Sequence, residues 1–160
     1  MAAADSDGVV VRPFLDADQA SVRALILEGL AGRWGHLDED LNPDLDDIEL
    51  TYGAGTTLTA WMDTRLVGTG TLVPRGKGVA EVLRMSTALD CRGRGIATRL
   101  LRLLLDDARR RGLRRVVLET SAGWTNARSL YERNGFIFDR EEEGEYGPDA
   151  HYWLDFSDSA

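Results

Sequence analysis

The chain has 160 residues, of which 43% are hydrophobic and 29% charged, and its formal net charge is −8 at pH 7. This length and composition are typical of one soluble domain with its own hydrophobic core. The negative charge excludes a general nucleic-acid-binding protein, and no apolar run approaches the roughly 20 residues that span a bilayer. A single cysteine, Cys91, excludes an internal disulfide and fits a reducing compartment, so we expect a cytoplasmic protein.

The first eight residues contain neither a basic nor an apolar stretch, which predicts a disordered lead over 1–8 rather than a signal peptide. The remaining residues, 9–157, then form a single domain. Their hydrophobic periodicity alternates between that of strands and that of helices. In order, the pattern predicts a strand beginning at Val9, a helix over 17–32, a hairpin of 56–63 with 65–76, a strand over 78–89, a helix closed by Gly112, a strand over 114–121, a helix over 125–135, and strands over 136–143 and 151–156.

This order puts antiparallel strands first and a strand–helix–strand crossover at the centre. It predicts an α+β fold with a mixed, mainly antiparallel twisted sheet flanked by helices, rather than a doubly wound nucleotide-binding fold. Within the strand over 78–89, the alternation predicts two faces, with Val79, Glu81, Leu83 and Met85 on one and Ala80, Val82 and Arg84 on the other.

Charge is unevenly distributed along the chain. Residues 91–115 hold nine arginines and two aspartates, a local balance of +7. Residues 38–49, by contrast, contain seven carboxylates. This asymmetry indicates two different ligand-facing ends, and the alternative is a solvated helix face beside an acidic surface.

The basic stretch begins with "RGRGIA", residues 92–97, which leads directly into a leucine-rich helix. Glycine lets the backbone adopt a positive φ and lets its amides approach a ligand closely. Amides at a helix start, with the positive end of the helix dipole behind them, favour a phosphate. No Gly-Lys-Ser/Thr follows, and the Gly-x-Gly-x-x-Gly pattern is absent, so the motif is neither a Walker loop nor a dinucleotide fingerprint.

Two motifs together resemble the GNAT superfamily of acetyl-CoA-dependent N-acetyltransferases, in its bacterial single-domain form. "RGRGIA" matches that family's pyrophosphate motif, Gln/Arg-x-x-Gly-x-Gly/Ala, at Arg92, Gly95 and Ala97. "ARSLYERNGF" is similar to its second motif, a tyrosine followed by Asn-Gly-Phe. The resemblance covers residues 9–156, and it implies transfer of an acetyl group from acetyl-CoA to a primary amine by direct attack on the thioester.

The resemblance also implies which residues hold the co-substrate. The loop Arg92, Gly93, Arg94, Gly95, Ile96, Ala97 and Thr98 would bind the CoA pyrophosphate. The backbone of Met85, Ser86 and Thr87 would pair with the pantetheine amides as an added strand, beside a neighbouring strand that splays away.

Tyr131 stands at the family's tyrosine position, where it would protonate the leaving thiolate. The chain departs from the family at Trp124, because the family often has Asn seven residues before that tyrosine. Asn126, two places later, is the candidate replacement for the missing cofactor contact.

Amine acetylation needs a base, because an alkylammonium has a pKa near 10. Two strand carboxylates are candidates, Glu119 and Glu81, with Glu119 favoured. The alternative is that each only pairs with a nearby arginine, Arg115 and Arg84 respectively. Backbone amides of residues 85–87 are the candidate oxyanion donors. His36 and His151 lack companions, so we expect no metal.

The acidic segment 38–49 lies where the family covers its acceptor, so a small-molecule or peptide amine of positive charge would be attracted there. The alternative is a solvated acidic loop. A second function class, a non-catalytic acyl-CoA-binding or sensing module, fits the same fold. We expect neither a nucleic-acid nor a membrane partner, and the resemblance adds a homodimer as a candidate assembly.

Overall fold

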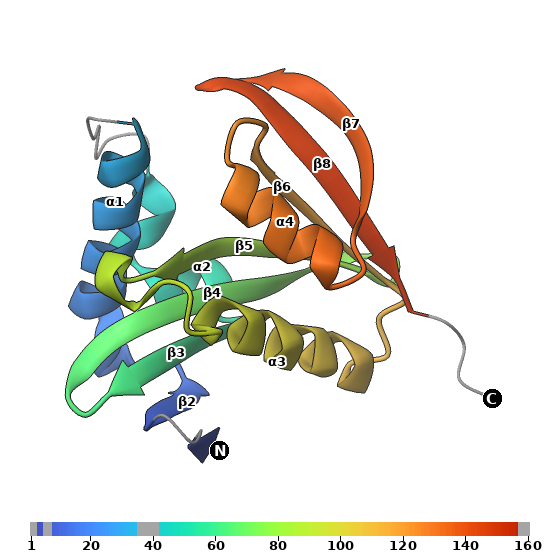
Figure 1. Cartoon of the computed structure of the whole chain (residues 1–160). Coiled ribbons are helices and arrows are strands. Elements are labelled where there is room, and N and C mark those ends of the chain that lie inside the picture. Colours follow the sequence, from blue (N-terminus) through green and yellow to red (C-terminus); the bar gives the residue numbers. More distant parts are fainter. Residues whose placement is uncertain (1–2, 5–7, 35–41, 157–160) are drawn as a thin grey trace.

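The computed structural model describes residues 3–4, 8–34 and 42–156 (Figure 1). Their elements run from a short N-terminal strand to a C-terminal hairpin. In chain order they are β1 (Ala3–Ala4), β2 (Val9–Pro13), η1 (Asp16–Asp18), α1 (Gln19–Trp34), η3 (Pro43–Asp46), α2 (Ile48–Tyr52), β3 (Thr56–Met62), β4 (Arg65–Gly76), β5 (Val79–Thr87), η4 (Leu89–Cys91), α3 (Ile96–Arg110), β6 (Arg115–Ser121), α4 (Thr125–Arg133), β7 (Ile137–Gly144) and β8 (Gly147–Asp155).

The eight strands of the described ranges form one sheet in the order β1-β2-β3-β4-β5-β6-β8-β7. Every neighbouring pair is antiparallel except β5 and β6, which α3 connects as a parallel crossover. The predicted mixed, mainly antiparallel sheet with a central strand–helix–strand crossover is therefore confirmed. Part of the predicted disordered lead is instead a strand, since Ala3–Ala4 pairs with Val10 and Val11. The other residues of the lead, apart from Gly8, lie outside the described ranges.

Helices cover both faces of this sheet and bury a separate apolar cluster on each. On one face, α3 packs on strands β3 to β5 and contributes Leu100, Leu101 and Leu104, all fully buried. On the other face, α1 and α2 pack through residues such as Val22 and Ile48. Figure 1 shows α1 and α3 on opposite sides of the sheet. The sheet is the shared wall of two cores, so its shape decides where a ligand can enter.

A β-bulge at Arg84 distorts β5. Thr71 lies opposite Leu83, but Thr69 lies opposite Ser86, so β5 has one extra residue in this stretch. Arg84 takes this up with φ 55°, a left-handed conformation that costs a non-glycine residue roughly 1–2 kcal/mol. The predicted strict alternation is therefore wrong beyond Leu83. Leu83 packs on the α1–α2 cluster, whereas Met85 packs on the α3 cluster.

The parallel pairing between β5 and β6 is short. It joins only Val79–Glu81 to Arg115–Val117. Beyond Glu81 the two strands separate, and β6 continues its pairing with β8 as far as Ser121. The splayed strands are visible in Figure 1, where β5 and β6 diverge. One edge of β5 is thus left without a strand partner over the residues that follow the bulge.

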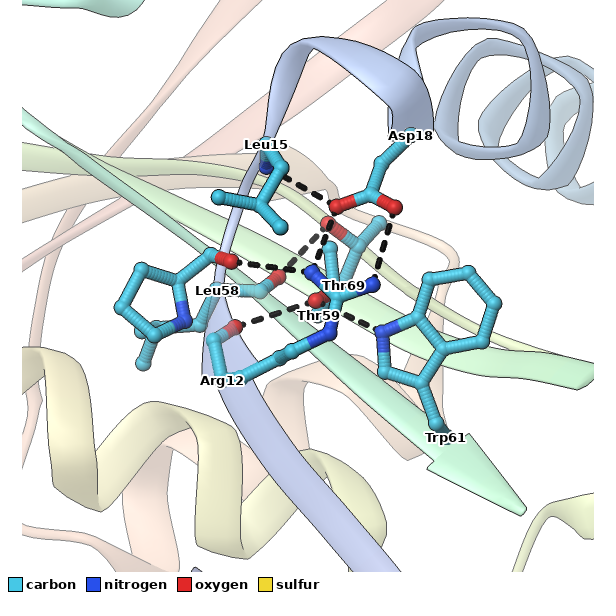
Figure 2. Close-up of polar contacts among 8 residues, drawn as sticks. Arg12, Leu15, Asp18, Leu58, Thr59, Trp61 and Thr69 are labelled. Carbon is cyan, nitrogen blue, oxygen red and sulfur yellow. Dashed lines mark hydrogen bonds and ion pairs between the residues drawn. The ribbon is translucent and has the colours of Figure 1, made fainter. Parts of the chain in front are cut away.

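A polar network fixes the start of α1 to the sheet (Figure 2). The guanidinium of Arg12 donates to both carboxylate oxygens of Asp18, at 2.7 and 2.9 Å, and lies 4.8 Å from the Trp61 ring centroid. The backbone N–H of Leu15 also donates to Asp18, at 2.8 Å. The Asp18 side chain is only 5% exposed, and the hydrogen bond from Arg12 is the main reason that its pKa is lowered.

Asp18→Ala is expected to lower the free energy of unfolding by about 3 kcal/mol, because it leaves the Arg12 charge without its partner. Asp16→Ala, at an exposed neighbouring carboxylate, should change it by less than about 0.5 kcal/mol. Urea unfolding followed by circular dichroism measures both. Similar losses in the two variants would contradict the prediction.

The same ion pair predicts a pH dependence. A carboxyl with a lowered folded pKa contributes its full stability above the unfolded pKa, about 3.9, and loses it as pH falls through the folded pKa. The stability difference between wild type and Asp18→Ala should therefore be constant from about pH 5 to 8 and narrow below about pH 4. A difference that grows on acidification would contradict this.

Candidate active site

A cleft of about 1240 Å³ opens where β5 and β6 separate. Its walls come from α1, β5, the start of α3, β6, α4 and the turn between β7 and β8. Every site residue predicted from the sequence lines this cleft except Arg94. The predicted residues that line the cleft are Glu81, Met85, Ser86, Thr87, Arg92, Gly93, Gly95, Ile96, Ala97, Thr98, Glu119, Asn126 and Tyr131.

The glycine-rich loop forms one end of the cleft. Gly93 and Gly95 have φ of 81° and 80°, the left-handed conformation for which glycine is suited. Gly95 is the N-cap of α3 and supplies no side-chain hydrogen bond, so no cap competes for the first amides of the helix. A Cβ at either glycine would meet no atom within 4 Å, so both backbones border open space. This end of the cleft is suited to an anion.

The free edge of β5 forms the long wall. After the bulge, Ser86 and Thr87 pair with β4 on one side, but β6 has separated from β5 on the other. An extended ligand can add to such an edge through main-chain hydrogen bonds. Ser86 also ties the edge to α1, because its hydroxyl donates to the Leu25 carbonyl at 3.4 Å.

Tyr131 lies between this edge and the core. Its ring contacts Phe136 edge-on at 5.9 Å and Tyr152 at 6.4 Å between centroids. Burial raises the pKa of Tyr131 to about 12, and the positive charge of Arg33 partly opposes this. The phenol therefore stays protonated near neutral pH, which is the state that a proton donor requires.

The two candidate bases have different surroundings. Glu81 accepts two hydrogen bonds from Arg75, at 2.9 and 2.7 Å. Glu119 lies opposite His151 across β6 and β8, with 3.6 Å between His151 Nε2 and Glu119 Oε2. Burial is the main cause that raises the pKa of Glu119, and Asp149 adds to it. A carboxylate with a raised pKa and no arginine is the better proton acceptor of the two.

The alternative considered for these glutamates, an ion pair of Glu119 with Arg115 and of Glu81 with Arg84, does not form. Arg115 binds Asp155 instead of Glu119, with Nε at 2.6 Å from Oδ1. Arg84 binds Asp44, with contacts of 2.9 and 2.7 Å, instead of Glu81. Both partners lie tens of residues from the arginine in sequence, which is why local spacing did not find them.

Arg84 and Asp44 belong to a hydrogen-bond network that lines the cleft. Asn42 accepts from Arg84 at 3.0 Å, and the Tyr52 hydroxyl donates to Asp44 at 2.5 Å. Burial raises the pKa of Tyr52 to about 12, and the Asp44 charge adds to the shift. The charge of Asp44 is thus balanced by Arg84, and its carboxylate also accepts a hydrogen bond from Tyr52.

This changes the role predicted for the acidic segment. Asp38, Glu39 and Asp40 lie outside the described residues, as does His36. Of the described part, Asp46 lies 3.6 Å from Arg23, and Asp47 caps α2 by accepting from Leu50. Among the described residues, the carboxylates that line the cleft without an arginine partner are Glu119 on β6, Asp149 on β8 and Glu145 in the turn between β7 and β8.

Trp124 and Asn126 begin α4. Trp124 is the N-cap of this helix and makes no side-chain cap hydrogen bond. The Trp124 ring instead lies 4.3 Å from the Arg33 guanidinium, at the end of α1. Sequence reasoning missed this pair, because 91 residues separate its members and no local pattern links them.

Within the described ranges, no group of three or more histidine, cysteine or acidic side chains is arranged to hold a metal ion. The same ranges contain no helix of sufficient length and apolarity to cross a membrane.

Comparison with known proteins gives a family match. The model of the acetyltransferase (GNAT) family matches residues 20–136, which is most of the chain. The chain belongs to this family. The matched range contains the glycine loop, the free edge of β5 and Tyr131.

Individual proteins that are similar to this chain are named as N-acetyltransferases. "Probable N-acetyltransferase camello" of Xenopus tropicalis is 37% identical over 71% of this chain, which spans about half (52%) of that relative's length. "Uncharacterized N-acetyltransferase YedL" of Escherichia coli is 31% identical over 85% of this chain and 86% of its own. PaiA N-acetyltransferase of Thermoplasma acidophilum, solved in complex with coenzyme A, shares the fold with a TM-score of 0.76 at 17% identity, over 92% of this chain and 99% of its own.

A matched pair of substitutions tests the anion site of this GNAT protein. Asp and Asn both tolerate the left-handed conformation of Gly95 and both cap helices well, so Gly95→Asp and Gly95→Asn should fold alike. Only the aspartate places a negative charge against a phosphate. Isothermal titration with CoA should give at least about 100-fold weaker binding for Gly95→Asp, roughly 2.7 kcal/mol. Equal affinities would contradict the placement.

Proposed function

We propose that the protein is an N-acetyltransferase that transfers the acetyl group of acetyl-CoA to a primary amine by direct attack on the thioester. The observation that most supports this is the convergence of three features on one cleft. The glycine loop suits a pyrophosphate, the free edge of β5 suits the pantetheine amides, and Tyr131 lines the same cleft with a phenol that could protonate the thiolate.

Acetyl-CoA is a co-substrate here, and the chain's residues fit its parts. The loop from Arg92 to Thr98 offers backbone amides, open space at two glycines and the positive end of α3. Arg94 does not line the cleft, so in this proposal it contributes charge from its rim. The backbone of residues 85–87 would hold the pantetheine in place, with its thioester near the bulge.

In the proposed reaction, Glu119 accepts a proton from the ammonium of the acceptor, directly or through water. The free amine nitrogen attacks the thioester carbon, and backbone amides of residues 85–87 donate to the oxyanion. The carbon–sulfur bond then breaks, Tyr131 donates its proton to the thiolate, and the second proton lost by the attacking nitrogen restores the Tyr131 phenol, directly or through water. The products are an amide and CoA, and the proton on Glu119 is finally released to solvent.

We propose a positively charged amine, on a small molecule or a peptide, as the acceptor. Glu119, Glu145 and Asp149 line the cleft, and none has an arginine partner among the described residues. Their negative potential would steer and orient a cationic acceptor. A panel of amines assayed at low and high salt tests this, and preference for a neutral or anionic amine would contradict it.

The decisive experiment for the function is release of free thiol from acetyl-CoA in the presence of that panel. Turnover with any amine supports the acetyltransferase. Tight CoA binding without turnover of any acceptor would support the second class, a non-catalytic acyl-CoA-binding module. A cytoplasmic location and a homodimer remain predictions.

Tyr131→Phe should lower kcat by about 10- to 1,000-fold, because it removes the hydroxyl that donates to the thiolate and keeps the buried ring. The affinity for CoA should change little, as titration calorimetry can verify. Unchanged kcat would remove Tyr131 from the mechanism.

Glu119→Gln and Glu81→Gln distinguish the two candidate bases. Glu119→Gln should lower kcat/KM by about 100-fold and abolish the acidic limb of its pH profile, which in wild type lies above the ordinary glutamate pKa because the pKa of Glu119 is raised. Glu81→Gln should cost less than about threefold, since Arg75 already binds that carboxylate. The reverse order of losses would assign the base to Glu81.

A further inference from the structure

Two arginine side chains, Arg33 and Arg92, line the same cleft. Arg33 stands in the last turn of α1, and Arg92 immediately precedes the glycines of the loop. Both line the cleft, and among the described residues neither forms an ion pair with a carboxylate. Burial against the cleft wall is the main cause that lowers the pKa of Arg33, and the neighbouring charge of Arg92 adds to it.

Both side chains are solvent-exposed, and neither is neutralised by an acid among the described residues. Two like charges repel, and the surrounding water weakens that repulsion. Arg33 is held in place by another contact.

That contact is Trp124. The Arg33 guanidinium carbon lies 4.3 Å from the centroid of the Trp124 ring, so the end of α1 is joined to the start of α4. This is a cation–π interaction, which strengthens when the cation is partly desolvated. Trp124 occupies the position where the family often has Asn, and an amide has no comparable π face for a guanidinium. The departure from the family therefore has a physical consequence: it fixes a cation beside Arg92.

We infer that Arg33, held on the Trp124 ring, binds a phosphate of acetyl-CoA together with Arg92. A guanidinium matches a phosphate through two parallel hydrogen bonds, and a bound anion converts the repulsion between the two cations into attraction to a shared partner. The co-substrate is then held from α1 and α4 as well as from the loop before α3. This inference rests on the proposed function, because it needs an acyl donor that carries phosphate.

The competing explanation is that the Arg33–Trp124 contact only packs two helix ends. The two explanations differ in what the loss of Arg33 does to CoA binding. Titration calorimetry with CoA on wild type, Arg33→Met, Trp124→Leu and the double variant measures the difference. Arg102→Met is the matched control, since it removes one exposed arginine of α3 that does not line the cleft.

Arg33→Met should weaken CoA binding about 10-fold, equivalent to roughly 1.4 kcal/mol, and Arg102→Met less than twofold. Trp124→Leu should weaken it about 3- to 10-fold, and the double variant no more than Arg33→Met alone, because the ring acts through the guanidinium. Trp124→Phe, which keeps a π face, should retain most of the affinity. The loss in Arg33→Met should shrink in 1 M salt.

Dephospho-CoA identifies the phosphate. If the Arg33→Met loss persists with this ligand, Arg33 binds the pyrophosphate, and if it disappears, Arg33 binds the 3′-phosphate. Either result supports the inference. Equal CoA affinities of Arg33→Met and Arg102→Met, with wild type binding CoA well, would overturn the inference and leave the proposed function intact. Failure of wild type itself to bind CoA would overturn both.

Discussion

The whole site depends on the loss of hydrogen bonding between β5 and β6. The two strands pair over three residues and then separate. In a continuous sheet the main-chain groups of residues 82–87 would be satisfied by β6, and no ligand could reach them. Because the pairing stops, these groups form one wall of a cleft, and α1, the start of α3, β6, α4 and the turn between β7 and β8 form the other walls. The bulge at Arg84 contributes directly, since the extra residue bends β5 at the place where it leaves its neighbour.

The side chain of Arg84 also stabilises the bulge. Arg84 holds an unfavourable left-handed conformation, and its side chain binds Asp44, which Tyr52 binds in turn. The conformational cost at one residue is offset by a charge-assisted network of several hydrogen bonds. The same network ties the η3–α2 segment to the strand that borders the cleft. The bulge and the η3–α2 segment are therefore fixed to each other beside the cleft.

Much of the fold could be predicted from the sequence, because element order follows from local periodicity and from glycine and proline positions. The glycine loop was likewise predictable, since all of its parts lie within seven consecutive residues. The bulge at Arg84 was not, because nothing in "EVLRMST" distinguishes an extra residue from regular alternation. The partners of Arg84 and Arg115, and the stacking of Arg33 on Trp124, were also missed. Those contacts join residues 40 to 91 positions apart, and the choice among many arginines and acids is made by the tertiary fold.

The three-residue junction between β5 and β6 has a thermodynamic consequence. It is the only strand pairing between the two halves of the described sheet, β1 to β5 and β6 to β8. Such halves can open locally at less cost than global unfolding. A ligand lying along β5 would replace the missing strand and oppose that opening. Folding stability would then rise with the free CoA concentration, by about 2.7 kcal/mol at 100 times Kd. Cellular CoA levels would in this way set how long the protein survives proteolysis.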